Sequence, residues 1–180
     1  MTTGDSSRIP LVVRRSASFA ILDMLRKLAL RLAVVLVLIL LAIQLVPYGR
    51  SHRNPPVVLE PPWDSPATRT LAERACFDCH SNLTRWPWYS HVAPVSWLIE
   101  RDVVEGREKL NFSEWNRPQE SAHESAEAVN EGEMPMYAYT VMHGHARLSP
   151  QQRDRLVAGL TQTFGSDRGR GDDEAEEHGR

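Results

Sequence analysis

One long apolar run near the start of the chain limits what the rest can form. Residues 32–46 contain a single polar side chain, Gln44, and the run reaches nineteen residues if it is counted from Leu28 and includes Arg31. A helix of that length spans roughly 28 Å, close to the hydrocarbon thickness of a bilayer. The run is apolar on every face, whereas a core helix is apolar on one stripe. We therefore expect one transmembrane helix within residues 28–48.

The charges around this run predict its orientation. Six basic side chains precede it, and only Arg50 and Arg53 follow it closely. The positive-inside rule then places the leader, residues 1–27, in the cytoplasm and everything after the run outside the membrane, which in a bacterium is the periplasm. A cleaved secretory signal is the alternative, but the leader is long for one and no small-residue cleavage site follows. We expect a retained single-pass anchor in the bacterial inner membrane.

The part after the anchor has room for one small domain. About 115 residues remain once the N-terminal section and the tail are set aside. Residues 49–64 are proline-rich and predict an extended tether, and residues 65–165 form the domain. Residues 166–180 hold six acids and no aromatic side chain, which predicts a disordered acidic tail. With 21 basic against 23 acidic residues, the chain lacks the basic footprint of a nucleic-acid binder.

Helical signals dominate the domain, and no strand alternation or repeat is evident. We expect helices over residues 65–80, 96–110, 121–133 and 149–164, with a loop between the last two. The start signals are Ser65 with Pro66, Ser96, and Ser149 with Pro150. Gly132 is the stop signal of the third helix. The buried face of the last helix is marked by Leu156, Leu160 and Phe164. The predicted fold class is all-α, a small helical domain behind one N-terminal transmembrane helix.

The pentapeptide Cys76-Phe77-Asp78-Cys79-His80 carries the chemistry. It matches the C-x-x-C-H pattern of covalent haem attachment. On a helix, positions three apart share a face, so both thiols can reach the vinyl groups at one porphyrin edge while His80 binds the iron. Attachment on the outer side of the membrane agrees with the orientation predicted from the flanking charges. The predicted cofactor is one covalently attached haem c.

Three other uses of the cysteines remain open. A thioredoxin-like redox pair would need a βαβ unit, which the pattern does not show. A structural disulfide across two residues would be strained and would leave His80 unexplained. A zinc site would have to combine the two thiols with two histidines, although none has zinc-finger spacing; the candidates are His80, His91, His123, His143 and His145.

The second axial ligand of the iron decides what a haem can do. Met134 is the predicted ligand, because it lies in a loop after Gly132 and a thioether is a soft donor. Met136, or one of His143 and His145, is the alternative, and an open face is a further one. The remaining histidines are expected at the surface; they are His52, His91, His123 and His178.

A dense aromatic segment follows the motif and could form either a wall of a haem pocket or part of an ordinary small core. Its members are Trp86, Pro87, Trp88, Tyr89 and Trp97. The same segment offers a possible partner for the proximal imidazole, the carbonyl oxygen of Pro94, which could accept a hydrogen bond from His80 Nδ1.

Several short stretches form a recognisable pattern: VPYGR, NPPV, ACFDCHSN, RWPWYSHVAPVSWLI, NFSEW, GEMP and ARLS. Together they resemble the haem-binding domain family of membrane-anchored bacterial c-type cytochromes, and the resemblance covers about residues 46–165. The resemblance implies a small fold like that of class I cytochromes c, with thioether bonds at Cys76 and Cys79, His80 as proximal ligand and Met134 as distal ligand. Met136 departs from the pattern, in which a second proline is expected after the Met-Pro pair.

The expected function is that of an electron carrier. A single-haem cytochrome would pass one electron at a time between unidentified periplasmic or membrane redox proteins. The sequence shows no acid–base constellation near the motif, so we do not expect an enzyme. The alternative is a haem-based sensor or gas-binding module with an open or labile sixth position. Weak peroxidase-like activity, with His143 as distal group, is a third possibility.

Overall fold

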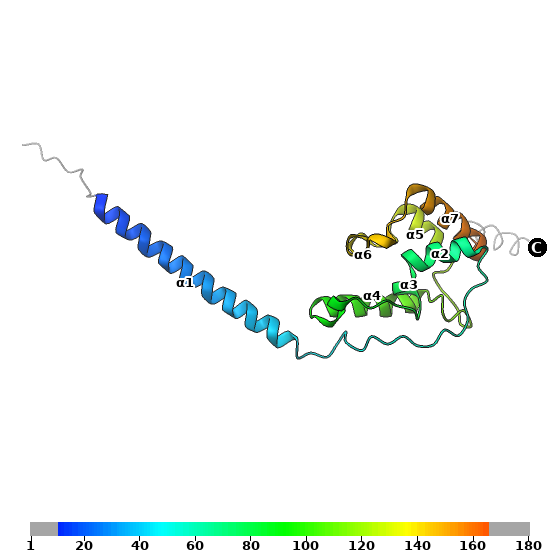
Figure 1. The fold of residues 1–180 in the computed structure, drawn as a ribbon, viewed down its shortest axis with the longest axis horizontal. Helices are drawn as coiled ribbons and strands as arrows, with labels where there is room; N and C mark the ends of the chain where they lie inside the picture. Colours follow the sequence, from blue (N-terminus) through cyan, green and yellow to red (C-terminus); the bar gives the residue numbers. More distant parts are fainter. Residues whose placement is uncertain (1–10, 166–180) are drawn as a thin grey trace, which may run out of the picture. The chain divides into compact units, whose positions relative to one another are not determined.

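The computed structural model describes residues 11–165 and divides the chain into two units, one ending at Pro47 and one starting at Tyr48 (Figure 1). In the first unit, helix α1 covers Leu11–Ile43. It starts earlier than the expected anchor and ends before the apolar run is complete. Its large apolar side chains are exposed from Phe19 to Leu41. The predicted acidic tail, residues 166–180, lies outside the described residues.

Within residues 11–165, no helix has the combined length and apolarity of a membrane-crossing segment.

The second unit is a helical domain. Its elements are α2 (Pro66–Ala75), α3 (Phe77–His80), the 3-10 turn η1 (Trp88–His91), α4 (Val95–Lys109), α5 (Ser125–Glu131), α6 (Tyr137–Met142), the 3-10 turn η2 (Gly144–Ala146) and α7 (Pro150–Phe164). The described part of the chain contains no strand, only an isolated bridge between Leu59 and Glu114. The all-α prediction is confirmed.

Residues 49–64 are extended, as predicted, but they do not form a free tether. The backbone N–H of Val58 donates to the Ser113 carbonyl at 2.8 Å, and the N–H of Trp115 donates to the Leu59 carbonyl at 2.9 Å. At the start of this segment, Gly49 is buried with a φ of +76°, and a Cβ there would collide with the Ser96 carbonyl oxygen. These residues are therefore part of the domain, and we call them the strap.

The helix starts follow the capping signals at two of three places. Ser65 accepts a hydrogen bond from the Thr68 N–H at the start of α2, and Ser149 forms a complete capping box with Gln152 at the start of α7. The expectation for Ser96 was wrong, because α4 starts at Val95 and Ser96 is buried in its first turn. There the N–H of Ser96 already bonds to the Val92 carbonyl.

Two further boundaries differ from the sequence prediction. The helix expected over residues 65–80 breaks at Cys76, and the expected loop before Ser149 contains α6 and η2. α6 has no buried residue, so it lacks the apolar periodicity by which a helix is recognised in a sequence. The third helix is shorter than expected and ends at Gly132, whose φ of +80° fits the predicted glycine stop.

The core lies where α2, α5 and α7 gather, with α3 between this group and α4 (Figure 1). Its buried members are Leu71, Ala72, Phe77, Leu110, Phe112, Ala126, Val129, Leu156 and Leu160. Trp63 from the strap packs its ring against Phe112 at 5.1 Å and Phe164 at 5.8 Å between centroids. The core therefore joins the strap, the cysteine motif through Phe77, and the C-terminal helix.

The crossing of α2 and α7 depends on Gly159. A Cβ at this position would overlap the buried Thr68 side chain, whose Cγ2 would be 2.6 Å away.

Gly159→Ala should therefore lower the free energy of unfolding by about 1–3 kcal/mol, because overpacking forces the helices apart. Urea unfolding followed by circular dichroism measures this. The exposed Gln162→Ala on the same helix should change little, and Thr68→Ala should restore part of the loss. A Gly159→Ala protein as stable as the wild type would contradict the close crossing.

Candidate haem site

The cysteine motif is folded around Cys76. Cys76 is the C-cap of α2 and the N-cap of α3. The Cys76 carbonyl oxygen accepts hydrogen bonds from the N–H groups of Cys79 at 3.1 Å and His80 at 2.9 Å. This single helical turn brings both cysteines and the histidine together. Both thiols are free and partly buried, and burial raises the pKa of each to about 12, so both are neutral at ordinary pH.

Three adjoining hollows surround this turn. The central hollow is lined by Cys76, Cys79, His80, Met134 and Met136 together with residues of α4 and Tyr139. The α5 hollow shares Cys76, His80 and Met134 with it and extends toward Phe112 and Val129. The α4–α6 hollow shares Cys79 and Met136 with the central one and extends between those two helices. The two cysteines, His80, Met134 and Met136 therefore all line the central hollow.

The His80 ring is fixed from one side. Nδ1 lies 3.0 Å from the Gly106 carbonyl oxygen and 3.1 Å from the Leu110 carbonyl oxygen. Because carbonyls only accept, Nδ1 carries the hydrogen, and Nε2 is the nitrogen left for a metal. Burial lowers the pKa of His80, against the opposing effect of these two hydrogen bonds, so the neutral ligating form is favoured. The expected partner, the Pro94 carbonyl, was wrong, since the C-terminal end of α4 supplies the acceptors.

Gly106 permits this arrangement. A Cβ on Gly106 would lie 2.7 Å from the Cys79 carbonyl oxygen and 3.3 Å from the Cys79 Cβ. Only glycine lets α4 approach α3 this closely. A glycine inside a helical pattern is itself a sequence signal for close packing, and it could have pointed to this contact.

The two methionines occupy different parts of the space. Met134 is packed against the core, and its N–H donates to the Ala128 carbonyl at 3.0 Å, which holds it to the end of α5. It lines the same two hollows as His80. Met136 lines the central and α4–α6 hollows instead. Since Met134 shares both of its hollows with His80, its position favours it as the iron ligand.

The two histidines considered as ligands are engaged elsewhere. His143 Nδ1 lies 3.1 Å from the Tyr139 carbonyl oxygen and its Nε2 lies 3.0 Å from the Tyr89 hydroxyl. Nε2 of His145 is 3.1 Å from the Arg85 guanidinium. Neither histidine lines the central hollow. Either one would have to break these contacts to bind an iron held by His80.

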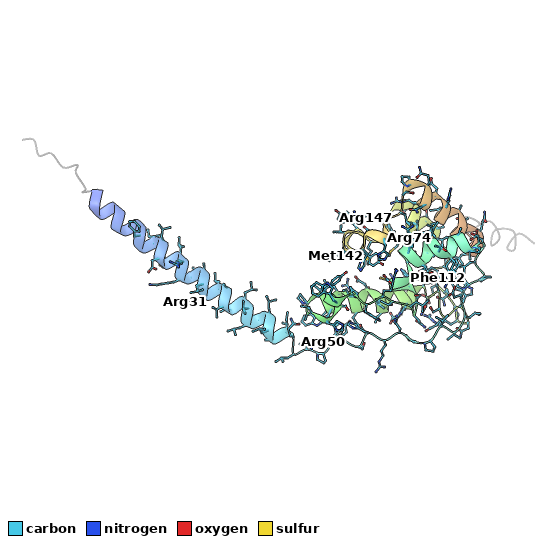
Figure 2. The ribbon with its side chains drawn as sticks, in the orientation of Figure 1. Arg31, Arg50, Arg74, Phe112, Met142 and Arg147 are labelled. Carbon is cyan, nitrogen blue, oxygen red and sulfur yellow. The ribbon has the colours of Figure 1, made fainter. Side chains whose placement is uncertain are left out.

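The aromatic segment does not form the expected wall. Tyr89 and Pro87 line the α4–α6 hollow, but Trp86 stacks on His52 and Trp88 is 79% exposed. Trp97 lines none of the three hollows. The aromatic residue that closes the α5 hollow is Phe112, which lies in the interior of the domain in Figure 2.

One polar cluster was missed by the sequence analysis. The buried carboxylate of Asp78, between the two cysteines, accepts hydrogen bonds from Arg85 Nε at 3.1 Å and from the Tyr139 hydroxyl at 2.6 Å. The Asp78 hydrogen bond raises the pKa of Arg85, and burial together with Asp78 raises the pKa of Tyr139. No local spacing signals this cluster, because Tyr139 is 61 residues from Asp78.

The other uses of the cysteines find little support. The described residues hold no group of three or more His, Cys, Asp and Glu side chains arranged for a metal ion, which leaves the zinc alternative without a site there. The free thiols do not form the disulfide. The helices around the motif, with no strand in residues 11–165, provide no βαβ unit for a thioredoxin-like pair.

The fold and the site together define a small all-α domain with the donor set that haem accepts. Two thiols, a neutral imidazole and a thioether line one space, so the residues present fit the group. Residues 38–162, more than two thirds of the chain, match the haem-binding domain family. The chain belongs to this family, and haem is its cofactor. No curated protein and no solved structure matches the chain.

Gly106 offers a test of the site that leaves every ligand in place. Gly106→Ala should push α4 away from α3, weaken the hydrogen bonds to His80 Nδ1 and cost about 1–3 kcal/mol of stability. We expect less bound haem per chain, measured by absorbance against protein concentration. Val104→Ala, an exposed position on the same helix, is the matched control. An equal haem content in Gly106→Ala and in the wild type would show that haem binding does not need the close approach of α4 to α3.

Proposed function

We propose that this chain is a membrane-anchored single-haem c-type cytochrome that carries electrons one at a time. The observation that carries the proposal is the common position of Cys76, Cys79 and His80 on one helical turn facing one hollow, with His80 oriented through Nδ1. A bound haem supplies an iron that alternates between the ferric and ferrous states. The protein's part is to hold the iron, exclude water and set the potential.

The two cysteines are the proposed attachment points of the haem. Each thiol would add across one vinyl group, with sulfur bonding to one carbon and the thiol hydrogen passing to the other, which makes two thioether bonds. Both thiols line the central hollow on the side of His80, as this reaction requires. The α4 carbonyls hold the imidazole in its ligating tautomer.

Met134 is the proposed second axial ligand. It shares the central and α5 hollows with His80, and its backbone is tied to α5. Histidine and methionine together give a closed iron with a raised potential, which suits an electron carrier better than a sensor or an enzyme. The proteins that donate and accept the electron are expected on the periplasmic side and in the membrane.

The anchor is proposed from the sequence and from the surface of α1. The fifteen-residue run has one polar side chain, and the apolar side chains of α1 are exposed to its surroundings. Arg26, Lys27 and Arg31 lie on the N-terminal side, and such long basic side chains can reach toward lipid headgroups. This orientation places the haem domain in the periplasm of a bacterium.

Covalent attachment and anchoring can be tested in one preparation. The full chain, made with a cytochrome c maturation system, should stay in membranes washed with alkaline carbonate and should stain for haem after denaturing electrophoresis. Replacing both Cys76 and Cys79 by Ser should abolish the stain, because no thioether bond remains. Staining of the double variant would refute thioether attachment, and release of the wild type into the carbonate wash would refute the anchor.

The axial assignment can be tested by comparing the two methionines. Met134→Ala should lower the reduction potential by on the order of 100 mV and let carbon monoxide bind the ferrous iron, because one axial position opens. Met136→Ala, two residues away, is the matched control and should retain the potential and the closed iron. Absorption spectra and redox titrations measure both. The reverse result would assign the ligand to Met136, and carbon monoxide binding by the wild type would favour a sensor.

A further inference from the structure

The α4–α6 hollow is separate from the residues that would bind the iron. It is lined by neither Cys76, His80 nor Met134, although Cys79, Met136 and Tyr139 connect it with the central hollow. Met142 of α6 is one of its walls and is labelled in Figure 2. Of the proposed haem residues only Cys79 lies on its wall, and its other walls have no part in holding the haem.

Its walls are mostly apolar. Four apolar side chains come from α4 (Val95, Leu98, Ile99 and Val103), and others come from Pro87, Ala138 and Met142. Leu98 and Met142 are 54% and 62% exposed, so the hollow opens to the surroundings. Aliphatic and thioether side chains around an open slot suit a flat apolar ring.

The polar end of the hollow presents acceptors. The Tyr139 hydroxyl donates to Asp78, and the Thr84 hydroxyl donates to the Asp78 backbone carbonyl at 2.8 Å. His143 Nδ1 must donate to the Tyr139 carbonyl, so Nε2 of the neutral ring accepts and the Tyr89 hydroxyl donates to it. All three hydroxyl groups thus use their hydrogens inside the protein. The Tyr89 and Tyr139 oxygens keep lone pairs, whereas Thr84 Oγ1 already accepts from Arg107 Nη2 at 2.8 Å.

The charged side chains of the hollow also favour a ligand that donates hydrogen bonds. Asp78 and Asp102 are carboxylates and only accept. The one cation on the wall is Arg85, whose Nε and Nη2 already donate to Asp78 and whose Nη2 also reaches His145. A ligand that donates hydrogen bonds therefore finds several oxygen acceptors on this wall.

We propose that the α4–α6 hollow binds a small aromatic molecule bearing hydroxyl groups, of the class of phenols and hydroquinones. Its ring lies between α4 and α6, and a hydroxyl donates to the oxygens of Tyr89 or Tyr139. The ligand would lie next to Cys79, in a hollow that Met134 does not line. This goes beyond the proposed function, since binding does not require electron transfer.

The test is equilibrium dialysis of hydroquinone against the haem-loaded full chain in detergent. Anaerobic buffer at pH 8.5 with excess ascorbate keeps both hydroquinone and haem reduced, so binding is measured without electron transfer. Saturable binding of one molecule per chain is expected. The ether 1,4-dimethoxybenzene, which has the same ring and no donor, should bind at least about fivefold more weakly.

Two variants locate the site. Leu98→Trp fills the hollow and should weaken hydroquinone binding at least about fivefold, whereas Val104→Trp, an exposed position of α4 outside the hollow, should leave it unchanged. Tyr89→Phe removes one acceptor and should weaken hydroquinone binding but not that of the ether.

Three results would overturn the proposal: no saturable binding, equal binding of the ether, or full binding by Leu98→Trp. Binding to the haem-free chain that disappears on haem loading would also overturn it, because the hollow would then belong to the haem site. Haem content and carbon monoxide binding are measured on the same samples, so failure of the cytochrome assignment is recognised separately.

Discussion

The site depends on the approach of α4 to the cysteine turn. The Gly106 and Leu110 carbonyls lie 3.0 Å and 3.1 Å from His80 Nδ1, and they reach it only because residue 106 has no side chain. A neutral imidazole with its hydrogen on Nδ1 can bind a metal only through Nε2. One backbone approach therefore fixes the tautomer and the side of the ring available to iron. Because His80 lines the central hollow, the orientation of its ring decides which atom the hollow presents to a cofactor.

A second set of contacts supports the residues just after the motif. Arg107, next to Gly106, donates to the Ser81 carbonyl at 2.8 Å and to the Arg53 carbonyl of the strap at 2.9 Å. The buried amide of Asn82 donates to the Pro56 carbonyl at 3.1 Å and to Glu114 at 3.0 Å. The strap and α4 thus hold the chain on the far side of His80. A segment that the proline content marks as a linker is here a structural wall of the domain.

The sequence predicted what depends on local patterns. The capping signals at Ser65 and Ser149, the stop at Gly132 and the all-α class are local properties, and the structure confirms them. The motif itself identified the haem family. The sequence could not predict the partner of His80 or the Asp78–Tyr139 hydrogen bond, because these join positions 26 to 61 residues apart. The sequence also could not decide whether the aromatic segment lines the haem pocket, because composition shows how many rings are present but not which way the backbone directs them.

Because the chain is synthesised from its N-terminus, the parts of the core are made at different times. Phe77 shares its cluster with Leu156 and Leu160 of α7, about eighty residues later in the chain. At synthesis rates of 5–20 residues per second, the cysteine turn precedes its covering helix by roughly 4 to 16 seconds. During that interval the two thiols cannot be enclosed by the finished core. The C-terminal position of α7 therefore leaves the cysteine turn without its covering helix until the chain is nearly complete.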